Sequence, residues 1–323
     1  MPVRQVRHVL VPLLLVLLAG AAPPAAATAG PERGDPAPAG PRPAAPRPGD
    51  PAVTAAKKLA TPGLPGANDW ACRPGRRHPR PLVLVHGTFA TGKAWGMAVP
   101  VFRASGRCVF VLDYGKTGAD DMYGMGPIAE SAKELAVFVD GVRAATGAAR
   151  VDIVGHSQGG MMPRQYLKFE GGAKKVHTLV GISPSNRGTT LSVRETLARE
   201  QPLLAVTLNQ MAKDVSCGAC WDQLAGSDFL KRLNEGGLTL PGISYAVAAT
   251  KYDSVVTPYK SQYLYDGPDE RNVLLQNHCA YDFTLHSGTA TDPIALRFAL
   301  NALDPGRAVK PDCGILANGL RRG

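Results

Sequence analysis

The chain has 323 residues, of which 45% are hydrophobic and 19% are charged, and its formal net charge is +10. These values are close to those of globular proteins and exclude a collagen-like or globally disordered chain. The lysines and arginines are scattered along the chain, whereas nucleic-acid-binding proteins gather theirs in a patch or stripe. We therefore expect no nucleic-acid partner.

The N-terminal segment has the pattern of a secretory signal peptide. Arg4 and Arg7 precede an apolar run from Val9 to Gly20, and the alanine-rich sequence that follows ends in the small-x-small pattern Ala27-Thr28-Ala29. The apolar run is too short to cross a membrane. We expect residues 1–29 to be a signal peptide and the protein to be secreted into the extracellular space.

Proline recurs every few residues after this segment, among alanine and glycine. Such a composition cannot bury a core and favours an extended, solvated chain. We expect residues 30–56 to be a linker and residues 57–323 to form one large folded domain.

Within this domain, apolar strand-like runs alternate with helical patterns. The strand runs are almost continuously apolar, as expected for strands covered by helices on both faces. The pattern predicts an α/β protein with a doubly wound, mostly parallel sheet. Residues 183–240 break the alternation and are expected to form a cap or lid insertion over the carboxyl edge of the sheet. The expected strands are 81–86, 108–112, 150–154, 176–182, 243–250 and 272–276, and the expected helices are 94–105, 127–145, 158–169 and 292–303.

The clearest functional motif is Gly155-His156-Ser157-Gln158-Gly159, which has the form G-x-S-x-G and lies between an expected strand and an expected helix. This is the context of a nucleophile elbow, where a serine sits on a strained turn and glycines leave room around it. We predict that Ser157 is a nucleophile. The free N–H groups at the start of the helix can stabilise an oxyanion, so the Gln158 backbone is one predicted donor.

A second oxyanion donor is expected after an early strand. His86-Gly87-Thr88-Phe89 follows the strand 81–86, and we predict that the Thr88 backbone is this donor. The Thr88 hydroxyl either adds a third hydrogen bond or caps the loop. Residues 87–93 also fit the phosphate-binding pattern G-x-x-x-x-G-K, but Ala94 stands where that motif needs a Ser or Thr for magnesium.

A catalytic acid and base should follow the serine in that order. Asp253 comes after a late strand, where the acid is expected, and is the predicted acid. The histidines after Ser157 are His177, His278 and His286. His177 begins a buried strand pattern and is interpreted as structural, and strand order alone favours His278 as the base. Three other aspartates are interpreted as solvated carboxylates: Asp222, Asp228 and Asp282.

The six cysteines are an even number that an oxidising compartment would pair. Cys217 and Cys220 have the C-x-x-C spacing of zinc and redox sites, but no second such pair or histidine pair accompanies them. We therefore expect a local disulfide there, and no metal.

Five segments together resemble the secreted actinobacterial lipases and esterases of the class 2 lipase family. The resemblance covers nearly all of residues 57–313. It implies an α/β-hydrolase fold, no cofactor and hydrolysis of carboxylic esters of lipid type. The segments are 68–72, 86–88, 106–110, 155–159 and 250–258.

The resemblance also implies roles for individual residues. The catalytic histidine of the family lies several residues beyond a cysteine and ahead of a helix, and His286 has this position relative to Cys279 and Asp292-Pro293. His286 is therefore the predicted base. The disulfides implied by the resemblance and by local order are Cys72 with Cys108, Cys217 with Cys220, and Cys279 with Cys313.

The substrate remains open at this stage. A lipase, a short-chain esterase and a polyester depolymerase would share every residue named above, and an exported peptidase or a catalytically silent surface-binding module could use the same fold. We expect a monomer that acts on a lipid or small ester, with a lipid–water interface as a further candidate partner. Apolar residues of the insertion would suit an acyl chain: Leu191, Leu197, Leu203, Leu204, Val206, Leu208 and Met211.

Overall fold

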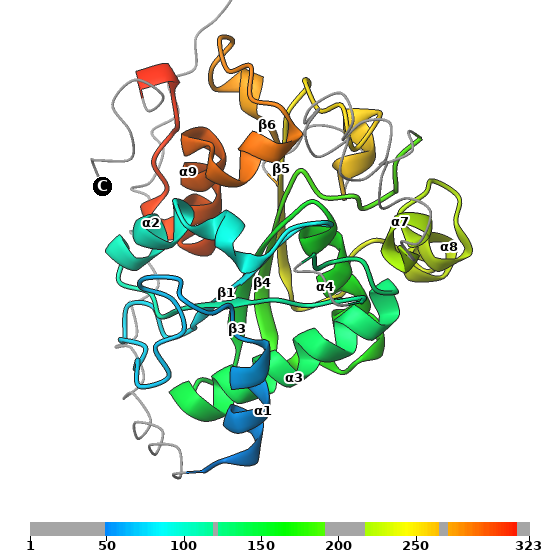
Figure 1. Ribbon diagram of the computed structural model, residues 1–323. Helices are drawn as coiled ribbons and strands as arrows, with labels where there is room; N and C mark the ends of the chain where they lie inside the picture. Colours follow the sequence, from blue (N-terminus) through cyan, green and yellow to red (C-terminus); the bar gives the residue numbers. More distant parts are fainter. Residues whose placement is uncertain (1–48, 119–121, 191–216, 265–270, 315–323) are drawn as a thin grey trace, which may run out of the picture. The chain divides into compact units, whose positions relative to one another are not determined.

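The computed structural model describes residues 49–118, 122–190, 217–264 and 271–314. The expected signal peptide and most of the expected linker lie outside these ranges. The described residues contain a six-stranded sheet (Figure 1). Its strands are β1 (Leu82–Val85), β2 (Val109–Leu112), β3 (Val151–His156), β4 (Val176–Ile182), β5 (Ser244–Ala249) and β6 (Asn272–Leu274).

All neighbouring strands run parallel, in the order β2-β1-β3-β4-β5-β6. The chain first moves outward to β2, then returns past β1 and proceeds strand by strand to β6. Val85 at the end of β1 lies opposite Gly155 of β3, which lies opposite Gly181 of β4. The loops after these strands therefore emerge at one edge of the sheet.

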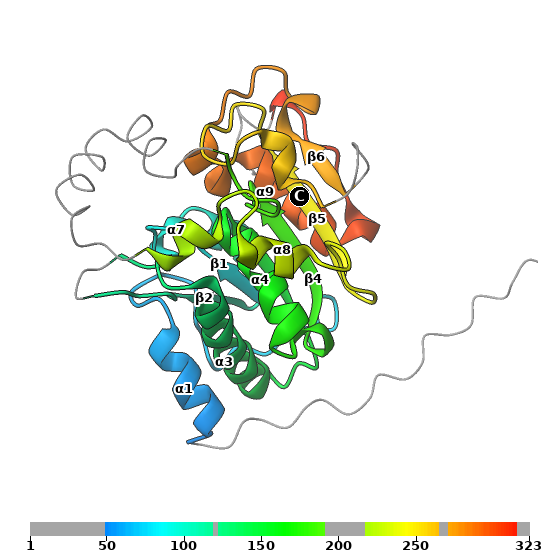
Figure 2. The same cartoon turned by 90° about the vertical axis from the view of Figure 1, so that its right-hand side faces the viewer.

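Helices cover both faces of the sheet, so the prediction of a doubly wound α/β protein is confirmed (Figures 1 and 2). No helix in the described ranges is long and apolar enough to span a bilayer. The described α-helices are α1 (Pro51–Leu59), α2 (Ala98–Ala104), α3 (Ile128–Thr146), α4 (Gln158–Phe169), α7 (Gly218–Asp222), α8 (Asp228–Asn234) and α9 (Pro293–Leu303). Short 3-10 helices are Gly92–Trp95, Gly172–Lys174, Tyr259–Gln262, Leu275–Asn277, His286–Thr291 and Pro305–Arg307.

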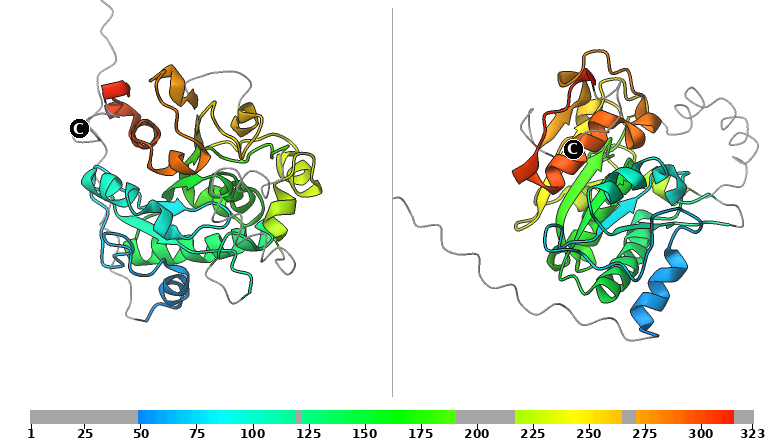
Figure 3. Two further views of the ribbon diagram at one scale, coloured as in Figure 1. Left: turned by 45° about the horizontal axis from the view of Figure 1, so that its top comes forward. Right: turned by 90° about the vertical axis from the view of Figure 1, so that its left-hand side faces the viewer.

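Alternate side chains of each strand enter two separate apolar cores. In β1, Val83 and Val85 face the core under α1, α3 and α4, whereas Leu82 and Leu84 face the core under α2 and α9. Figure 3 shows α2 and α9 on their side of the sheet from two further directions. Because both faces are covered, all four residues of β1 are buried, which explains why the strand has no polar alternation.

Helix α1 was not expected, and it corrects the predicted linker boundary. Asp50 caps the helix, because its Oδ1 accepts a hydrogen bond of 2.8 Å from the Ala52 N–H, and Pro51 occupies the first turn. A Cβ on Gly141 of α3 would lie 2.2 Å from the Ala56 Cβ, so only small residues allow α1 and α3 to approach this closely. Residues 51–56 are therefore helical and packed, and are not an extended linker.

The expected insertion 183–240 is described at both its ends. Its apolar residues named above lie outside the described residues. Thr189 N donates to Gln223 O, and Ala225 N donates to Thr189 O, both at 3.0 Å. These bonds form a parallel bridge between Thr189 and Leu224. The two described ends of the insertion are therefore tied to each other.

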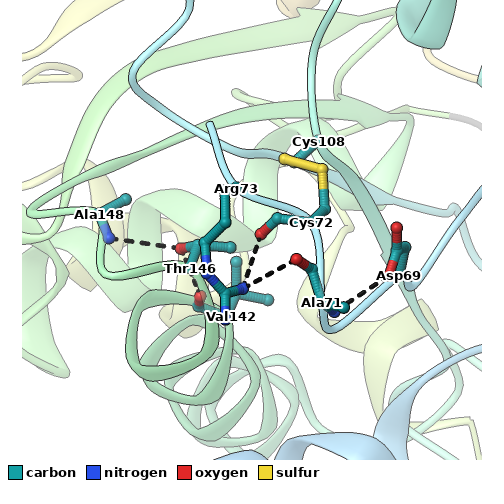
Figure 4. The surroundings of a disulfide bond; sticks show 8 residues. All are labelled: Asp69, Ala71, Cys72, Arg73, Cys108, Val142, Thr146 and Ala148. Atoms are coloured by element: carbon teal, nitrogen blue, oxygen red, sulfur yellow. Dashed lines mark hydrogen bonds between the residues drawn. A yellow bond between two sulfur atoms is a disulfide. The ribbon is translucent and has the colours of Figure 1, made fainter. Parts of the chain in front are cut away.

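Three disulfides occur in the described chain: Cys72–Cys108, Cys217–Cys220 and Cys279–Cys313. This is the pairing that the family resemblance implied. Figure 4 shows the first of them, which joins the segment before β1 to the residue before β2. Beside it, Arg73 Nη1 donates to the carbonyl oxygens of Ala71 and Cys72 at 3.0 and 3.1 Å.

The stabilisation from these disulfides should follow the length of chain that each closes. Cys72 and Cys108 are separated by 36 positions and Cys217 and Cys220 by 3. The loss of unfolded-chain entropy is then worth about 4 kcal/mol for the first pair and about 2 kcal/mol for the second. We expect Cys72→Ser/Cys108→Ser to lower the free energy of unfolding in urea by more than Cys217→Ser/Cys220→Ser does. Equal losses would contradict this explanation.

Candidate functional site

The predicted site residues meet at the carboxyl edge of the sheet. Ser157 follows β3, Thr88 follows β1 and Asp253 follows β5, while His286 lies beyond β6. A cavity of about 250 Å³ opens at this edge, and Thr88, Ser157 and His286 all line it. The parallel order of the strands therefore brings together residues that are far apart in the sequence.

Ser157 lies on a strained turn between β3 and α4. Its φ is 56° and its ψ is −125°, which is a conformation that non-glycine residues rarely adopt. The neighbouring glycines permit this turn. A Cβ on Gly155 would lie 1.8 Å from Gly159 O, and a Cβ on Gly159 would lie 2.3 Å from Val85 O. The structure therefore has the geometry of a nucleophile elbow.

The loop after β1 is held by His86. Its Nδ1 lies 2.8 Å from Gly87 O and therefore donates to it, while its Nε2 accepts from the Tyr114 N–H at 3.4 Å. The Tyr114 hydroxyl donates to His86 O at 2.7 Å. Burial lowers the pKa of His86 to about 4, so the ring stays neutral and keeps this arrangement of one donor and one acceptor.

Thr88 is tied to the elbow by its side chain. Its hydroxyl donates to Gln158 Oε1 at 2.9 Å and accepts from Gln223 Nε2 at 3.0 Å. Gln223 Oε1 in turn accepts from the Ser185 hydroxyl at 2.9 Å. The Thr88 hydroxyl was expected either to add a hydrogen bond to an oxyanion or to cap the loop. In the structure it fixes the loop. No hydrogen bond within the described residues uses the backbone N–H of Thr88 or of Gln158, so both remain available to a bound group.

Asp253 is a buried carboxylate that is fully surrounded by donors. Its Oδ1 accepts from the Val255 and Val256 N–H groups at 2.9 and 2.7 Å, and its Oδ2 accepts from Gln262 Nε2 at 2.9 Å. Burial alone would raise the pKa of Asp253, but attraction to His286 and these hydrogen bonds outweigh it and hold the pKa below its usual value. The side chain is therefore ionised at neutral pH.

His286 binds this carboxylate. Its Nδ1 lies 2.7 Å from Asp253 Oδ2, and the residue is 5% exposed. Because Nδ1 donates to the carboxylate, Nε2 of the neutral ring is left as the acceptor. No hydrogen bond joins His286 to Ser157 among the described residues, but both line the same cavity. Such contacts are often long before substrate binds.

His156 supports His286 from the elbow, a role that the sequence did not reveal. Its Nε2 donates to His286 O at 3.0 Å, and the two ring centroids are 4.9 Å apart. Burial, together with the nearby His286, lowers the pKa of His156 to about 3. A neutral His156 adds no positive charge beside the predicted base.

The segment that leads to His286 is held by two buried carboxyl groups. Asp282 Oδ1 accepts from Thr284 N at 2.9 Å, and Asp292 Oδ2 accepts from the Thr284 hydroxyl at 3.1 Å. Thr284 O accepts from the Thr250 hydroxyl at the end of β5 at 2.8 Å. This network joins the segment that carries the predicted base to the segment that carries the predicted acid.

The other sequence candidates lie outside this cavity. His177 is the second residue of β4, and its Nδ1 lies 2.8 Å from Thr178 Oγ1. His278 follows β6 but does not line the cavity. The interpretation of the three aspartates holds for Asp228, whose carboxylate is exposed.

Of the other two aspartates, Asp282 is buried and Asp222 is half-buried. Asp222 accepts from the Ile128 N–H at the start of α3 at 2.8 Å. Asp282 is 1% exposed. The interpretation as a solvated carboxylate was therefore wrong for Asp282, whereas Asp222 is partly exposed and also binds a backbone donor of another segment.

The cavity wall is largely apolar, and the described residues offer no metal site. No group of three or more His, Cys, Asp or Glu side chains in the described ranges could hold a metal ion. Cys217 and Cys220 are oxidised to a disulfide and present no thiolates. The apolar part of the wall consists of Phe89, Ala90, Ala94, Val255, Val256 and Ala290.

Comparison with known proteins identifies both a family and a fold. The family described as Lipase (class 2) matches residues 79–299. Among solved structures, lipase B of Aspergillus fumigatus superposes with a TM-score of 0.57 at 20% identity, over 77% of this chain and 56% of that chain. This chain therefore spans little more than half of that lipase. The likeness shows an α/β-hydrolase fold.

Two further structures are more distant. The mature form of lipase BlEst2 of Bacillus licheniformis has a TM-score of 0.42 at 18% identity, over 56% of this chain and 69% of that chain. An extracellular α/β-hydrolase of a Paenibacillus species has a TM-score of 0.45 at 16% identity, over 69% of this chain and 99% of that chain.

The buried Asp292 should reduce stability at neutral pH. Burial, together with the nearby Asp282, raises the pKa of Asp292 to about 6. Its folded-state pKa therefore exceeds its unfolded value, so stability falls as pH rises from about 4 to about 6 and is flat above that range. Asn can still cap α9 through its carbonyl oxygen. We expect Asp292→Asn to raise the free energy of unfolding at pH 7 by about 2 to 3 kcal/mol, with little change at pH 4.

Denaturant titrations at both pH values measure this difference. Asp228→Asn is the matched control, because Asp228 is exposed and pairs with Lys231 at 2.9 Å. It should show no comparable gain between pH 4 and pH 7. A gain for Asp292→Asn that is equal at both pH values would contradict the proposed titration.

Proposed function

The chain belongs to the class 2 lipase family, and we propose that it is a secreted serine hydrolase of lipid-type carboxylic esters that works through an acyl-enzyme on Ser157. One observation carries this proposal. His286 binds the buried Asp253 at 2.7 Å and lines the same cavity as Ser157. An elbow serine and a histidine that line one cavity, with a buried aspartate bound to that histidine, are the components of ester hydrolysis through a covalent intermediate.

In the first step, Ser157 Oγ attacks the carbonyl carbon of the ester. His286 Nε2 takes the hydroxyl proton, and Asp253 holds the ring orientation and stabilises the positive charge that develops on it. The attack converts the carbonyl oxygen into an oxyanion. The N–H groups of Thr88 and Gln158 then stabilise this negative charge.

The tetrahedral intermediate collapses when the bond between the carbonyl carbon and the alcohol oxygen breaks. His286 gives its proton to the leaving alcohol, and the acyl group remains on Ser157 Oγ. Water then attacks the acyl-enzyme with His286 again acting as the base. This second step releases the carboxylic acid and restores the serine hydroxyl.

The apolar wall of the cavity supports an acyl chain as the group transferred. Phe89, Val255 and Val256 lie beside Ser157 in this wall. Each buried methylene of a chain contributes roughly 0.8 kcal/mol. Short fatty-acyl esters and longer lipid esters both satisfy this requirement, and the enzyme distinguishes them by the number of methylenes it buries.

Secretion and domain organisation belong to the same proposal. The three disulfides support export, since such bonds persist in oxidising compartments. We propose that the catalytic domain extends from α1 to the C-terminal region, with the insertion 183–240 as a cap, and that the enzyme acts as a monomer without a cofactor.

The substrate class is tested by a series of p-nitrophenyl esters from acetate to palmitate, with an emulsified triglyceride measured alongside. A lipase hydrolyses the triglyceride and the long-chain esters, whereas an esterase prefers short, soluble esters. An aminoacyl-p-nitroanilide measured in parallel distinguishes a peptidase. Absence of ester turnover together with amide cleavage would refute the proposal.

The site residues are tested by variants assayed on p-nitrophenyl butyrate. We expect Asp253→Asn and His286→Ala each to lower kcat/KM by about 10⁴-fold or more, and Ser157→Ala to abolish labelling by a fluorophosphonate. His278→Ala is the matched control, because His278 also follows β6 but does not line the cavity. It should retain nearly full activity. Loss of activity in His278→Ala with retention in His286→Ala would reverse the assignment of the base.

A further inference from the structure

The segment from Tyr281 to His286 is built with its apolar side outward. Tyr281, Phe283 and Leu285 are 78%, 63% and 48% exposed, whereas Asp282 and His286 between and beyond them are 1% and 5% exposed. A segment packed on a protein core normally buries its apolar side chains and exposes its polar ones. Here that alternation is inverted.

The polar side of the segment is hydrogen-bonded to neighbouring parts of the chain. Asp282 O accepts from Gln276 Nε2 at 2.8 Å, and Thr284 binds Asp282, Asp292 and Thr250 through the contacts described above. Cys279 anchors the chain just before the segment through its disulfide with Cys313. The exposed apolar side chains therefore lie on a segment that hydrogen bonds and a disulfide attach to the rest of the domain.

Tyr252, in the loop after β5, extends this apolar row, and Lys251 lies beside it. The Tyr252 ring lies 5.3 Å from the Phe283 ring, and Lys251 Nζ lies 4.9 Å from the centre of the Tyr252 ring. Strands β5 and β6 are neighbours in the sheet (Figure 1), so these loops meet at its carboxyl edge. We call Tyr252, Tyr281, Phe283 and Leu285 the aromatic rim.

We propose that the aromatic rim is the surface with which the enzyme docks on an aggregated lipid ester, an inference that rests on the proposed function. The rim leads directly to His286, which lines the cavity, so a lipid surface bound there delivers ester groups to Ser157. Tyrosine rings with an apolar body and a polar tip are the side chains favoured at lipid–water interfaces. Lys251 beside them suits anionic head groups and fatty-acid products.

Binding without hydrolysis is measured in the Ser157→Ala background by co-sedimentation with phosphatidylcholine vesicles, with and without phosphatidylglycerol. We expect Tyr281→Ser/Phe283→Ser to weaken partitioning by about 10- to 100-fold. Phe169→Ser is the matched control. Phe169 is also an exposed phenylalanine with a lysine ammonium 5.2 Å from its ring, but it is the last residue of α4, at the opposite end of that helix from the elbow. It should bind like the Ser157→Ala parent.

The same double substitution in the active enzyme separates docking from catalysis. We expect kcat/KM on soluble p-nitrophenyl acetate to stay nearly unchanged, while the rate on emulsified triglyceride falls with the loss of vesicle binding. Unaltered vesicle binding in the double variant, or no vesicle binding by the parent, overturns the proposal. A dimer that the double substitution dissociates in sedimentation would assign the rim to a second copy and also overturn it. Loss of docking without any ester turnover in the unsubstituted enzyme would instead refute the proposed function.

Discussion

No side-chain atom fits between the turn after β3 and the end of β1, and the geometry of the site depends on this close approach. A Cβ on Gly159 would lie 2.3 Å from both Val85 O and His86 O. The elbow that carries Ser157 is therefore pressed against the backbone that leads to Thr88. The two free N–H groups of Thr88 and Gln158 come from separate segments, yet this contact and the hydrogen bond from the Thr88 hydroxyl to Gln158 fix one relative to the other. Donors that are already in position lose little free energy to reorganisation when charge develops.

A second set of contacts joins the segments that carry the proposed acid, Asp253, and the proposed base, His286. The Thr250 hydroxyl at the end of β5 binds Thr284 O, and Gln276 Nε2 binds both Thr250 Oγ1 and Asp282 O. The backbone before His286 is thus tied to the backbone before Asp253 by side chains that take no part in the proposed chemistry. His156 adds a bond from the elbow to His286 O. The three segments of the site are consequently linked by polar contacts as well as by the sheet.

Much of the fold could be predicted, because continuous apolar runs identify strands that are covered on both faces, and all six were expected within a few residues. Helix α1 was missed because it directly follows the proline-rich stretch and packs on α3 through small residues such as Ala56 and Gly141. The elbow was visible because its glycines are adjacent in sequence. The roles of Gln223 and Asp222 were not, since each depends on a partner that only the folded chain brings near. The residue type alone does not show whether an aspartate is buried or exposed to solvent.

The tie between Thr189 and Leu224 has a consequence for how such enzymes diversify. Thr189 O, Gln223 O and the backbone N–H groups that bind them close the insertion at its base, and Gln223 on that base also holds Thr88. The entropy of a loop changes only slowly with its length. The length of the chain between residues 190 and 217 can therefore change in evolution or design while these bonds at the base, including that from Gln223 to Thr88, are kept.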